Sequence, residues 1–136
     1  MRSVDGRTFL HLIHRYYPFR GGSEYYFQSL SEQLAADGAN VHLVTTDAWD
    51  LEYFWDPSRR RIDTPRESLN GVEIHRVPVH HLPFSNLTHR VIRRGMGELS
   101  RVRFPGQRRF LSASGRFGPW LPDLPQLLDD IGQDAA

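Results

Sequence analysis

The chain has 136 residues, of which 39% are hydrophobic and 24% charged, so it is long enough for one globular domain with a modest core. Its seventeen basic and sixteen acidic side chains give a net charge of +1, which excludes polyanion binding through overall charge alone. All basic residues are arginine, which excludes a lysine-dependent phosphate loop or Schiff base. The absence of cysteine excludes disulfides, cysteine-ligated metals and cysteine nucleophiles.

The N-terminal segment does not have the pattern of a secretory signal. Residues 8–13 form only a brief apolar run, shorter than the 7–15 residues or so that such a signal requires. No stretch of the sequence approaches the ~20 apolar residues of a membrane span. We therefore expect a cytoplasmic protein, either free or bound peripherally at the inner face of the membrane.

The first half of the chain has the pattern of a regular β–α–β unit. Residues 8–14 form a short, nearly continuous apolar run, which is typical of a strand buried on both faces. Ser23 can cap a helix that runs to about residue 37, with apolar residues at helical spacing on one face. Residues 41–46 are a second apolar strand, and the helical crossover implies that the two strands are parallel.

The second half of the chain is less regular. Residues 47–70 predict a long loop, whose aromatic cluster Trp49–Trp55 we expect to cover part of the core rather than to stack on a sugar. An Asn-Gly turn then precedes a third strand over residues 72–77. Two helices follow over residues 86–102 and 122–131, with a loop between them. The order β-α-β-β-α-α predicts a doubly wound, Rossmann-like α/β domain whose parallel sheet is incomplete.

The loop after the first strand is the best candidate for a binding site. It contains the adjacent glycines Gly21 and Gly22, which allow a ligand to approach the backbone closely. Amide groups at the start of a helix bind phosphate or carboxylate, and in doubly wound folds this loop faces the ligand crevice. Alternatively, the glycines only provide the dihedral angles of a tight strand-to-helix turn.

No bound cofactor or metal is expected. The loop lacks the third glycine of the dinucleotide fingerprint, which argues against NAD or FAD even though Asp47 could mimic the ribose-binding acid. The seven histidines do not form a ligand pair at metal-binding spacing on a predicted helix. His14, at the mouth of the predicted cleft, is the histidine that we single out for function.

The motif Pro18-x-x-Gly21-Gly22-x-Glu24 after an apolar strand resembles the opening of glycosyltransferase family 4, whose members have the GT-B fold. The resemblance continues through the Ala36-Asp37-Gly38 helix end, the second strand and the Asn70-Gly71-Val72 turn. It covers roughly residues 8–80, and the double glycine is its most specific part. The sequence departs from the family at Ala39, where members often carry histidine.

The resemblance implies an activity and roles for three residues. Members have two Rossmann-like domains facing a cleft, and transfer a sugar with retention of configuration from a nucleotide sugar to a sugar, lipid or small-molecule acceptor. The amides of Gly21 and Gly22 would approach the donor diphosphate, and Glu24 would lie on the acceptor side. From their positions in the sequence we also place His14 and Arg20 on the acceptor side, and Arg20 either pairs with a phosphate or is simply solvated. The nucleotide sugar is a substrate, and the resemblance implies no further cofactor.

The resemblance also implies that residues 1–136 are part of the N-terminal, acceptor-side domain. In the family, a fourth strand and then a nucleotide-sugar-binding domain with a Glu-x7-Glu pattern follow, and this sequence contains neither. We therefore expect the 136-residue chain to be inactive alone. We also predict that residues 8–14 present an unpaired apolar edge, which makes the chain marginally stable or prone to self-association.

Residues 86–118 contain eight arginines and a single acidic residue, Glu98, with apolar residues at helical spacing. This composition predicts either contact with an anionic membrane, which suits a lipid acceptor, or simply a solvated helix and loop. Nucleic acid is not expected as a partner, because the aromatic residues follow no RNA-binding pattern. The second hypothesis for the chain is therefore a non-enzymatic α/β interaction module that contacts a membrane or a partner through this segment.

Overall fold

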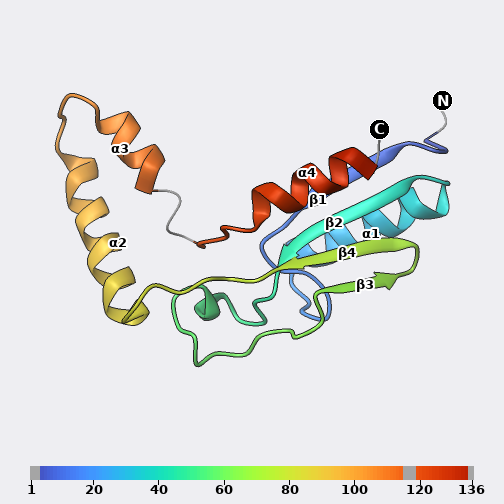
Figure 1. The fold of residues 1–136 in the computed structure, drawn as a ribbon, viewed down its shortest axis with the longest axis horizontal. Helices are drawn as coiled ribbons and strands as arrows, with labels where there is room; N and C mark the ends of the chain where they lie inside the picture. The colour runs from blue at the N-terminus through green and yellow to red at the C-terminus, as the bar shows by residue number, and fades with distance from the viewer. Residues whose placement is uncertain (1–3, 115–118, 135–136) are drawn as a thin grey trace.

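Four strands form one mixed sheet in the order β1-β2-β4-β3 (Figure 1). The computed structural model describes residues 4–114 and 119–134. Its strands are β1 (Thr8–Leu12), β2 (Asn40–Thr46), β3 (Arg66–Leu69) and β4 (Val72–Val77). Its α-helices are α1 (Gly22–Ala36), α2 (Ser85–Arg101), α3 (Gln107–Ser114) and α4 (Leu124–Asp134), and a 3-10 helix spans Leu51–Phe54. The predicted α/β fold, in which helices alternate with strands, is confirmed.

The main core lies between α1 and the sheet. β1, β2 and β4 run parallel, as expected from the helical crossover. Side chains alternate between the two faces of a strand, and the apolar residues of β2 and β4 that face α1 are at most 2% exposed. These residues are Val41, Leu43, Val72 and Ile74. Of the apolar residues predicted on one side of α1, Phe27 and Leu34 pack against the core, whereas Leu30 is exposed.

The sheet is not wholly parallel, because β3 pairs antiparallel with β4. The connection is Asn70-Gly71, whose φ angles of 52° and 81° suit a two-residue hairpin of type I′. The turn was predicted, but the expectation of a loop up to residue 70 was wrong. The four residues of β3 carry only one apolar side chain, Leu69. The strand therefore forms through its pairing with β4 and has no alternation of apolar and polar residues that would predict it.

The predicted loop between the two C-terminal helices also contains an additional helix, α3. A short, largely polar sequence gives little helical signal, since most helix stability in proteins comes from packing. In the structure, Gln107 Nε2 donates to the carbonyls of Leu99 and Ser100 at the end of α2, at 3.3 and 3.2 Å. The rings of Phe104 and Phe110 pack edge to face, with their centroids 6.1 Å apart. Arg116, one of the eight arginines counted in residues 86–118, lies outside the described residues.

The opposite face of the sheet is covered in part by α4. Ile131 of α4 is buried against Val44 and Val77, with three leucines of the helix around it. The sheet is thus sandwiched between α1 and α4 (Figure 1). On β1 this cover is incomplete, because Leu10 and Leu12 remain 41% and 50% exposed. The expectation that this strand is buried on both faces was therefore wrong.

β1 forms an edge of the sheet, as predicted for residues 8–14. Within the described ranges its one strand partner is β2. An edge strand with unpaired backbone groups and exposed leucines can pair with another chain. Self-association through this edge remains a prediction.

The long loop after β2 packs around a small core of its own. Ala48, Tyr53, Phe54 and Val79 are buried together, and Trp55 packs against them. The expected core-covering role of the Trp49–Trp55 cluster is seen for its second half. Trp49 instead lies under the guanidinium of Arg60, 4.3 Å from the ring centroid.

Helices α2 and α3, with the residues that flank them, form an arm over residues 84–114 (Figure 1). The first turn of α2 is attached to the loop core, since the Ser85 hydroxyl donates to the Trp55 carbonyl. The His89 ring also lies 6.5 Å from the Trp55 ring, centroid to centroid. The Arg93 guanidinium lies 5.9 Å from the centroid of the same Trp55 ring. Beyond these contacts, α2 extends away from the sheet and α3 turns back beside α2 (Figure 1).

Candidate functional site

The loop between β1 and α1 lies at the carboxyl ends of the parallel strands, where ligands bind in doubly wound folds. Its first residues continue alongside β2: the Ile13 amide donates to the Val44 carbonyl at 3.1 Å. The Thr46 hydroxyl donates to the His14 carbonyl at 2.6 Å. The position of the loop is therefore fixed by the neighbouring strand.

The Glu24 carboxylate is held inside this loop. Glu24 is only 7% exposed, and its Oε1 lies 3.4 Å from Arg15 Nη2. The Ser23 hydroxyl donates to Oε2 at 2.9 Å. The Arg15 guanidinium in turn lies 3.7 Å from the centroid of the Phe19 ring. Both carboxylate oxygens of Glu24 therefore have partners, Arg15 in the loop and Ser23 in the first turn of α1, and the ion pair connects the two ends of the loop.

Gly21 leaves room for this arrangement, whereas its dihedral angles do not call for glycine. Its φ of −126° and ψ of −178° are extended angles that any residue adopts. A Cβ at this position would lie 2.4 Å from Glu24 Oε2. Any side chain at residue 21 therefore displaces the buried carboxylate.

Gly22 has no such structural requirement. It is the first residue of α1, and it is not among the described glycines with positive φ. A Cβ at Gly22 would have no described atom within 4 Å. The amides of a helix's first turn have no carbonyl partner within the helix. The tight-turn alternative thus explains neither glycine, and Gly22 presents an open backbone surface at the start of α1.

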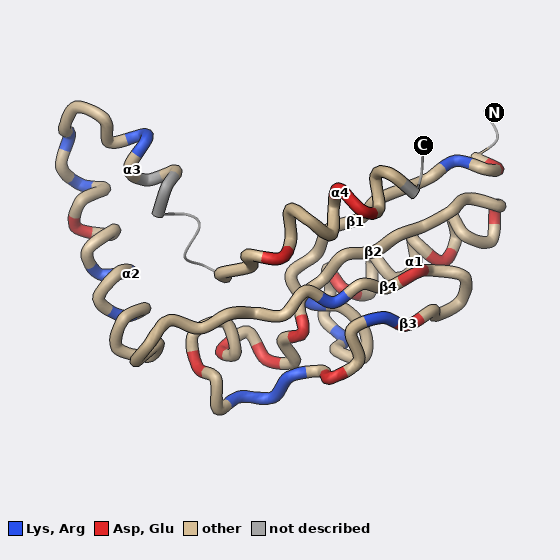
Figure 2. The backbone as a smooth tube through the Cα atoms, viewed as in Figure 1, with Lys and Arg blue, Asp and Glu red and all other residues tan. Residues whose placement is uncertain are grey.

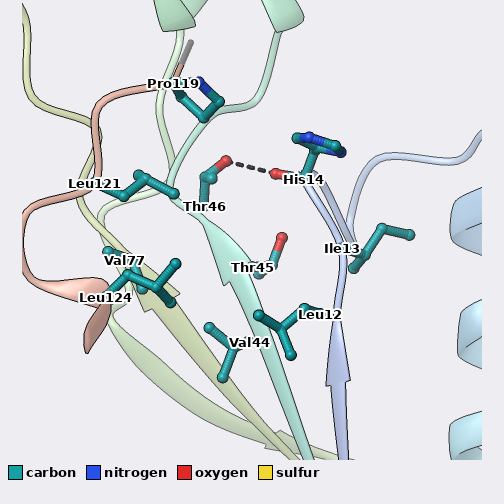
Figure 3. Close-up of a pocket in the computed structure, with 10 residues that line it drawn as sticks. All are labelled: Leu12, Ile13, His14, Val44, Thr45, Thr46, Val77, Pro119, Leu121 and Leu124. Atoms are coloured by element: carbon teal, nitrogen blue, oxygen red, sulfur yellow. Dashed lines mark hydrogen bonds between the residues drawn. The ribbon is translucent and has the colours of Figure 1, made fainter. Parts of the chain in front are cut away.

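Beside this loop, a cavity of about 190 Å³ opens between the sheet and residues 119–124 (Figure 3). His14, Thr46 and Pro119 lie at one end, and Leu12, Val44 and Leu124 lie further along the strands (Figure 3). Of the residues proposed from the sequence, His14 lines this cavity. Gly21, Gly22, Glu24 and Arg20 are not among its lining residues.

The cavity lining is mainly apolar and has few polar groups. His14 is its one titratable side chain, and the Thr45 hydroxyl is buried with no hydrogen-bond partner among the described residues. Arg20 is exposed on the loop between β1 and α1 and has no ion-pair partner in the described part of the chain. The site therefore has an apolar cavity with a histidine at its rim and, separately, an open glycine with an exposed arginine.

Arg76 supports the loop and was not identified from the sequence. Its side chain is 1% exposed and forms a salt bridge with Glu67. Arg76 Nη2 donates to the Tyr17 carbonyl at 2.8 Å, and Nη1 donates to the Thr64 carbonyl at 3.1 Å. One arginine therefore joins the glycine loop to the segment before β3. Its sequence signal is a charged residue on the face of β4 that otherwise carries Val72 and Ile74.

Asp47, considered as a ribose-binding acid, has a role within the fold. Its Oδ1 accepts the amide hydrogen of Val79 at 3.0 Å, and the residue is 7% exposed. Burial raises the pKa of the Asp47 carboxyl group, although this hydrogen bond and Arg61 act in the opposite direction. The carboxylate thus connects the end of β2 to the chain that follows β4.

The internal histidines pair with neighbouring side chains. His11 Nδ1 is hydrogen-bonded to the Ser31 hydroxyl at 2.8 Å, and His42 Nδ1 to His75 Nε2 at 3.1 Å. Burial lowers the pKa of His11 and of His75, and His42 lowers that of His75 further. Within residues 4–114 and 119–134, no group of three potential ligands is placed to hold a metal ion.

Comparison with family models, with curated proteins and with solved structures finds no match for this chain. What is shown is therefore the fold: a small α/β domain with a Rossmann-like, four-stranded and mostly parallel sheet. None of the helices in the described residues is long and apolar enough to cross a membrane.

Proposed function

We propose that this chain forms the acceptor-side domain of a retaining glycosyltransferase with the GT-B fold. Such an enzyme moves a sugar from a nucleotide-sugar donor to a sugar or lipid acceptor. The observation that carries the proposal is Gly22, the first residue of α1. Its backbone is accessible, and it lies at the carboxyl ends of the parallel strands. The resemblance of the Pro18–Glu24 loop to glycosyltransferase family 4 supports the same assignment.

The chemistry assigned to the loop is stabilisation of the leaving diphosphate. When the bond between sugar and diphosphate breaks, negative charge develops on the phosphate oxygens. Fixed amide hydrogens and the positive end of the α1 dipole stabilise that charge without reorganising. Gly22 gives a phosphate access to these amides, and the exposed guanidinium of Arg20 provides a second positive group nearby in the sequence.

The ion pair inside the loop maintains this geometry. Glu24 and Arg15 hold the two ends of the loop together, and Gly21 leaves room for the Glu24 carboxylate. We therefore assign Glu24 a positioning role on the acceptor side rather than direct contact with the reacting atoms. Arg76 also supports the loop, through the Tyr17 carbonyl.

The apolar cavity is assigned to the acceptor. Its lining suits the hydrocarbon part of a lipid or the apolar face of a sugar. His14 at its rim can form a hydrogen bond with an acceptor hydroxyl. In glycosyltransferases of this type, a second domain binds the nucleotide, so we expect these 136 residues alone to bind a donor weakly and not to transfer sugar.

The proposal is tested by NMR titration of the isotopically labelled chain with UDP-glucose and with GDP-mannose. We expect at least one donor to shift the amide signals of residues 21–24, and the corresponding nucleoside without phosphate to leave them unchanged. Gly22→Ala should fold normally, because space is open around its Cβ, but should weaken these shifts. Gly95→Ala is the matched control, since that glycine also has open space around it but lies within α2.

The proposal fails if neither donor shifts the signals of residues 21–24, or if Gly22→Ala shows the same donor-induced shifts as the Gly95→Ala control and the unmodified chain. The second candidate function, a non-enzymatic interaction module, is favoured by the exposed arginines of the arm. That candidate predicts binding through residues 84–114 with no effect of any nucleotide sugar.

A further inference from the structure

The arm exposes apolar side chains that the rest of the described chain does not cover. On α2, Leu87, Val91 and Leu99 are 64%, 62% and 40% exposed. At 3.6 residues per turn these three side chains lie on one side of the helix. Phe84, directly before the helix, is 86% exposed. Burial of such groups against a partner is favourable, at ~25 cal/mol per Å² removed from water.

The same arm is strongly basic. Residues 84–114 contain seven arginines and one acidic residue, Glu98. The carboxylate of Glu98 is 3.3 Å from the Arg101 guanidinium, so its charge is compensated within the helix. Figure 2 shows the basic positions along α2 and α3 with a single acidic one between them. The arm is therefore complementary to an anionic surface.

The two properties lie side by side on α2. With about 100° between successive residues, its four arginines fall within roughly a quarter to a third of the helix circumference. This basic sector borders the sector that carries Leu87 and Val91. A helix with an apolar side and arginines along its polar side is the form that lies in a membrane interface.

Phe84 adds an independent observation. Its φ of 53° and ψ of 43° are in the left-handed region, which is costly for a bulky side chain. Its ring gains little packing within the described chain in return, because most of its surface is exposed. Asparagine adopts these angles readily, so the local backbone does not require an aromatic residue here.

We propose that the arm binds the surface of an anionic lipid membrane. Phe84, Leu87 and Val91 enter the boundary between headgroups and acyl chains, and the arginines of α2 contact lipid phosphates. An RNA partner would use the arginines but leave the aliphatic side chains exposed, so the lipid surface accounts for more of the structure. The inference does not depend on the proposed glycosyl transfer.

Vesicle flotation with the 136-residue chain tests this proposal. We expect binding to vesicles of phosphatidylcholine mixed with phosphatidylserine, much weaker binding to phosphatidylcholine alone, and loss of binding as salt is raised. Each arginine near such a surface contributes about a fivefold change in affinity. Arg90→Gln with Arg94→Gln should therefore weaken binding roughly 25-fold. The charge-matched control, Arg59→Gln with Arg66→Gln, should weaken it much less, because both residues lie outside the arm.

Phe84→Asn separates membrane contact from folding. This variant should weaken vesicle binding several-fold while its thermal stability stays equal or rises, because asparagine relieves the left-handed strain. The proposal is overturned if phosphatidylserine does not strengthen binding to vesicles, or if the arm variants and the control variant bind vesicles with the same affinity. Tight binding to single-stranded poly(U) RNA without vesicle binding would also overturn it and assign the arm to nucleic acid.

Discussion

Apolar side chains are buried in the core of the sheet body but exposed on the arm. Around β2 and β4, the apolar side chains that face α1 are at most 2% exposed. Along the arm, Phe84, Leu87 and Val91 are each more than half exposed, and the arginines of α2 lie in the sector of the helix next to Leu87 and Val91. The apolar residues of the sheet body are buried by contacts within the chain. Those of the arm are exposed beside arginines, a composition typical of a surface that binds a partner. The predictions below, from the largest expected effect to the smallest, test this difference.

The largest loss of stability is expected in the body, at Arg76. Arg76→Met removes a buried guanidinium that joins Glu67 to the carbonyls of Tyr17 and Thr64. Its removal leaves two carbonyls without their hydrogen bonds and the partly exposed Glu67 without its ion pair, at a cost of about 3 kcal/mol. Urea unfolding should show this loss, and adding Glu67→Met should recover part of it. A loss below about 1 kcal/mol would show that Arg76 does not hold the loop.

Gly21→Ala should destabilise the chain by about 2 kcal/mol, because its Cβ displaces the charged carboxylate of Glu24 from Arg15 and Ser23. Gly22→Ala, one residue later, should change stability by less than about 0.5 kcal/mol. Thermal and urea unfolding of the two variants measure the difference. Equal losses would contradict the distinct roles that we assign to these glycines.

Stability should fall as the pH drops below about 6.5, the ordinary pKa of histidine. The pKa of His75 is lower in the folded chain because of burial and His42, so the unfolded chain takes up the proton first. This contribution is complete above pH ~6.5 and is lost as the pH falls towards the folded pKa, with a slope of at most about 1.4 kcal/mol per pH unit. His75→Gln should flatten the urea-midpoint profile between pH 7 and 5.5 or so, and the exposed-residue control His80→Gln should flatten it less. A profile that stays equally steep in His75→Gln would assign the acid sensitivity to other groups.

The smallest effect on stability is expected in the arm. Leu87→Gln with Val91→Gln should alter the free energy of unfolding by less than about 0.5 kcal/mol per residue, because both side chains are exposed. Differential scanning calorimetry measures this change. A clear drop in melting temperature would mean that these residues already pack within the chain in solution, which would remove the contrast between the two regions.

The sequence predicted most of the body because its signals are local. Apolar runs located β1, β2 and β4, and the double glycine located the loop that begins α1. β3 was missed because pairing with β4 defines it, and α3 because its packing against the end of α2 does. Both depend on contacts between segments, which periodicity does not record.

The candidate site was only partly visible in the sequence for the same reason. The glycine motif gave the position of the loop, and His14 was placed at the rim of the cavity. The ion pair between Arg15 and Glu24 and the support from Arg76 depend on side chains brought together by folding. The space around Gly22, which distinguishes it from Gly21, likewise depends on three-dimensional structure.

Hydrogen exchange of the chain with UDP-glucose or GDP-mannose tests the central claim most directly. The account predicts slower exchange at the amides of residues 22–24 with at least one donor, and no change within α2. It also predicts that Gly22→Ala loses most of this protection while keeping its fold. If exchange at residues 22–24 is unchanged by both donors, the loop is not a diphosphate site and the assignment to glycosyl transfer is wrong.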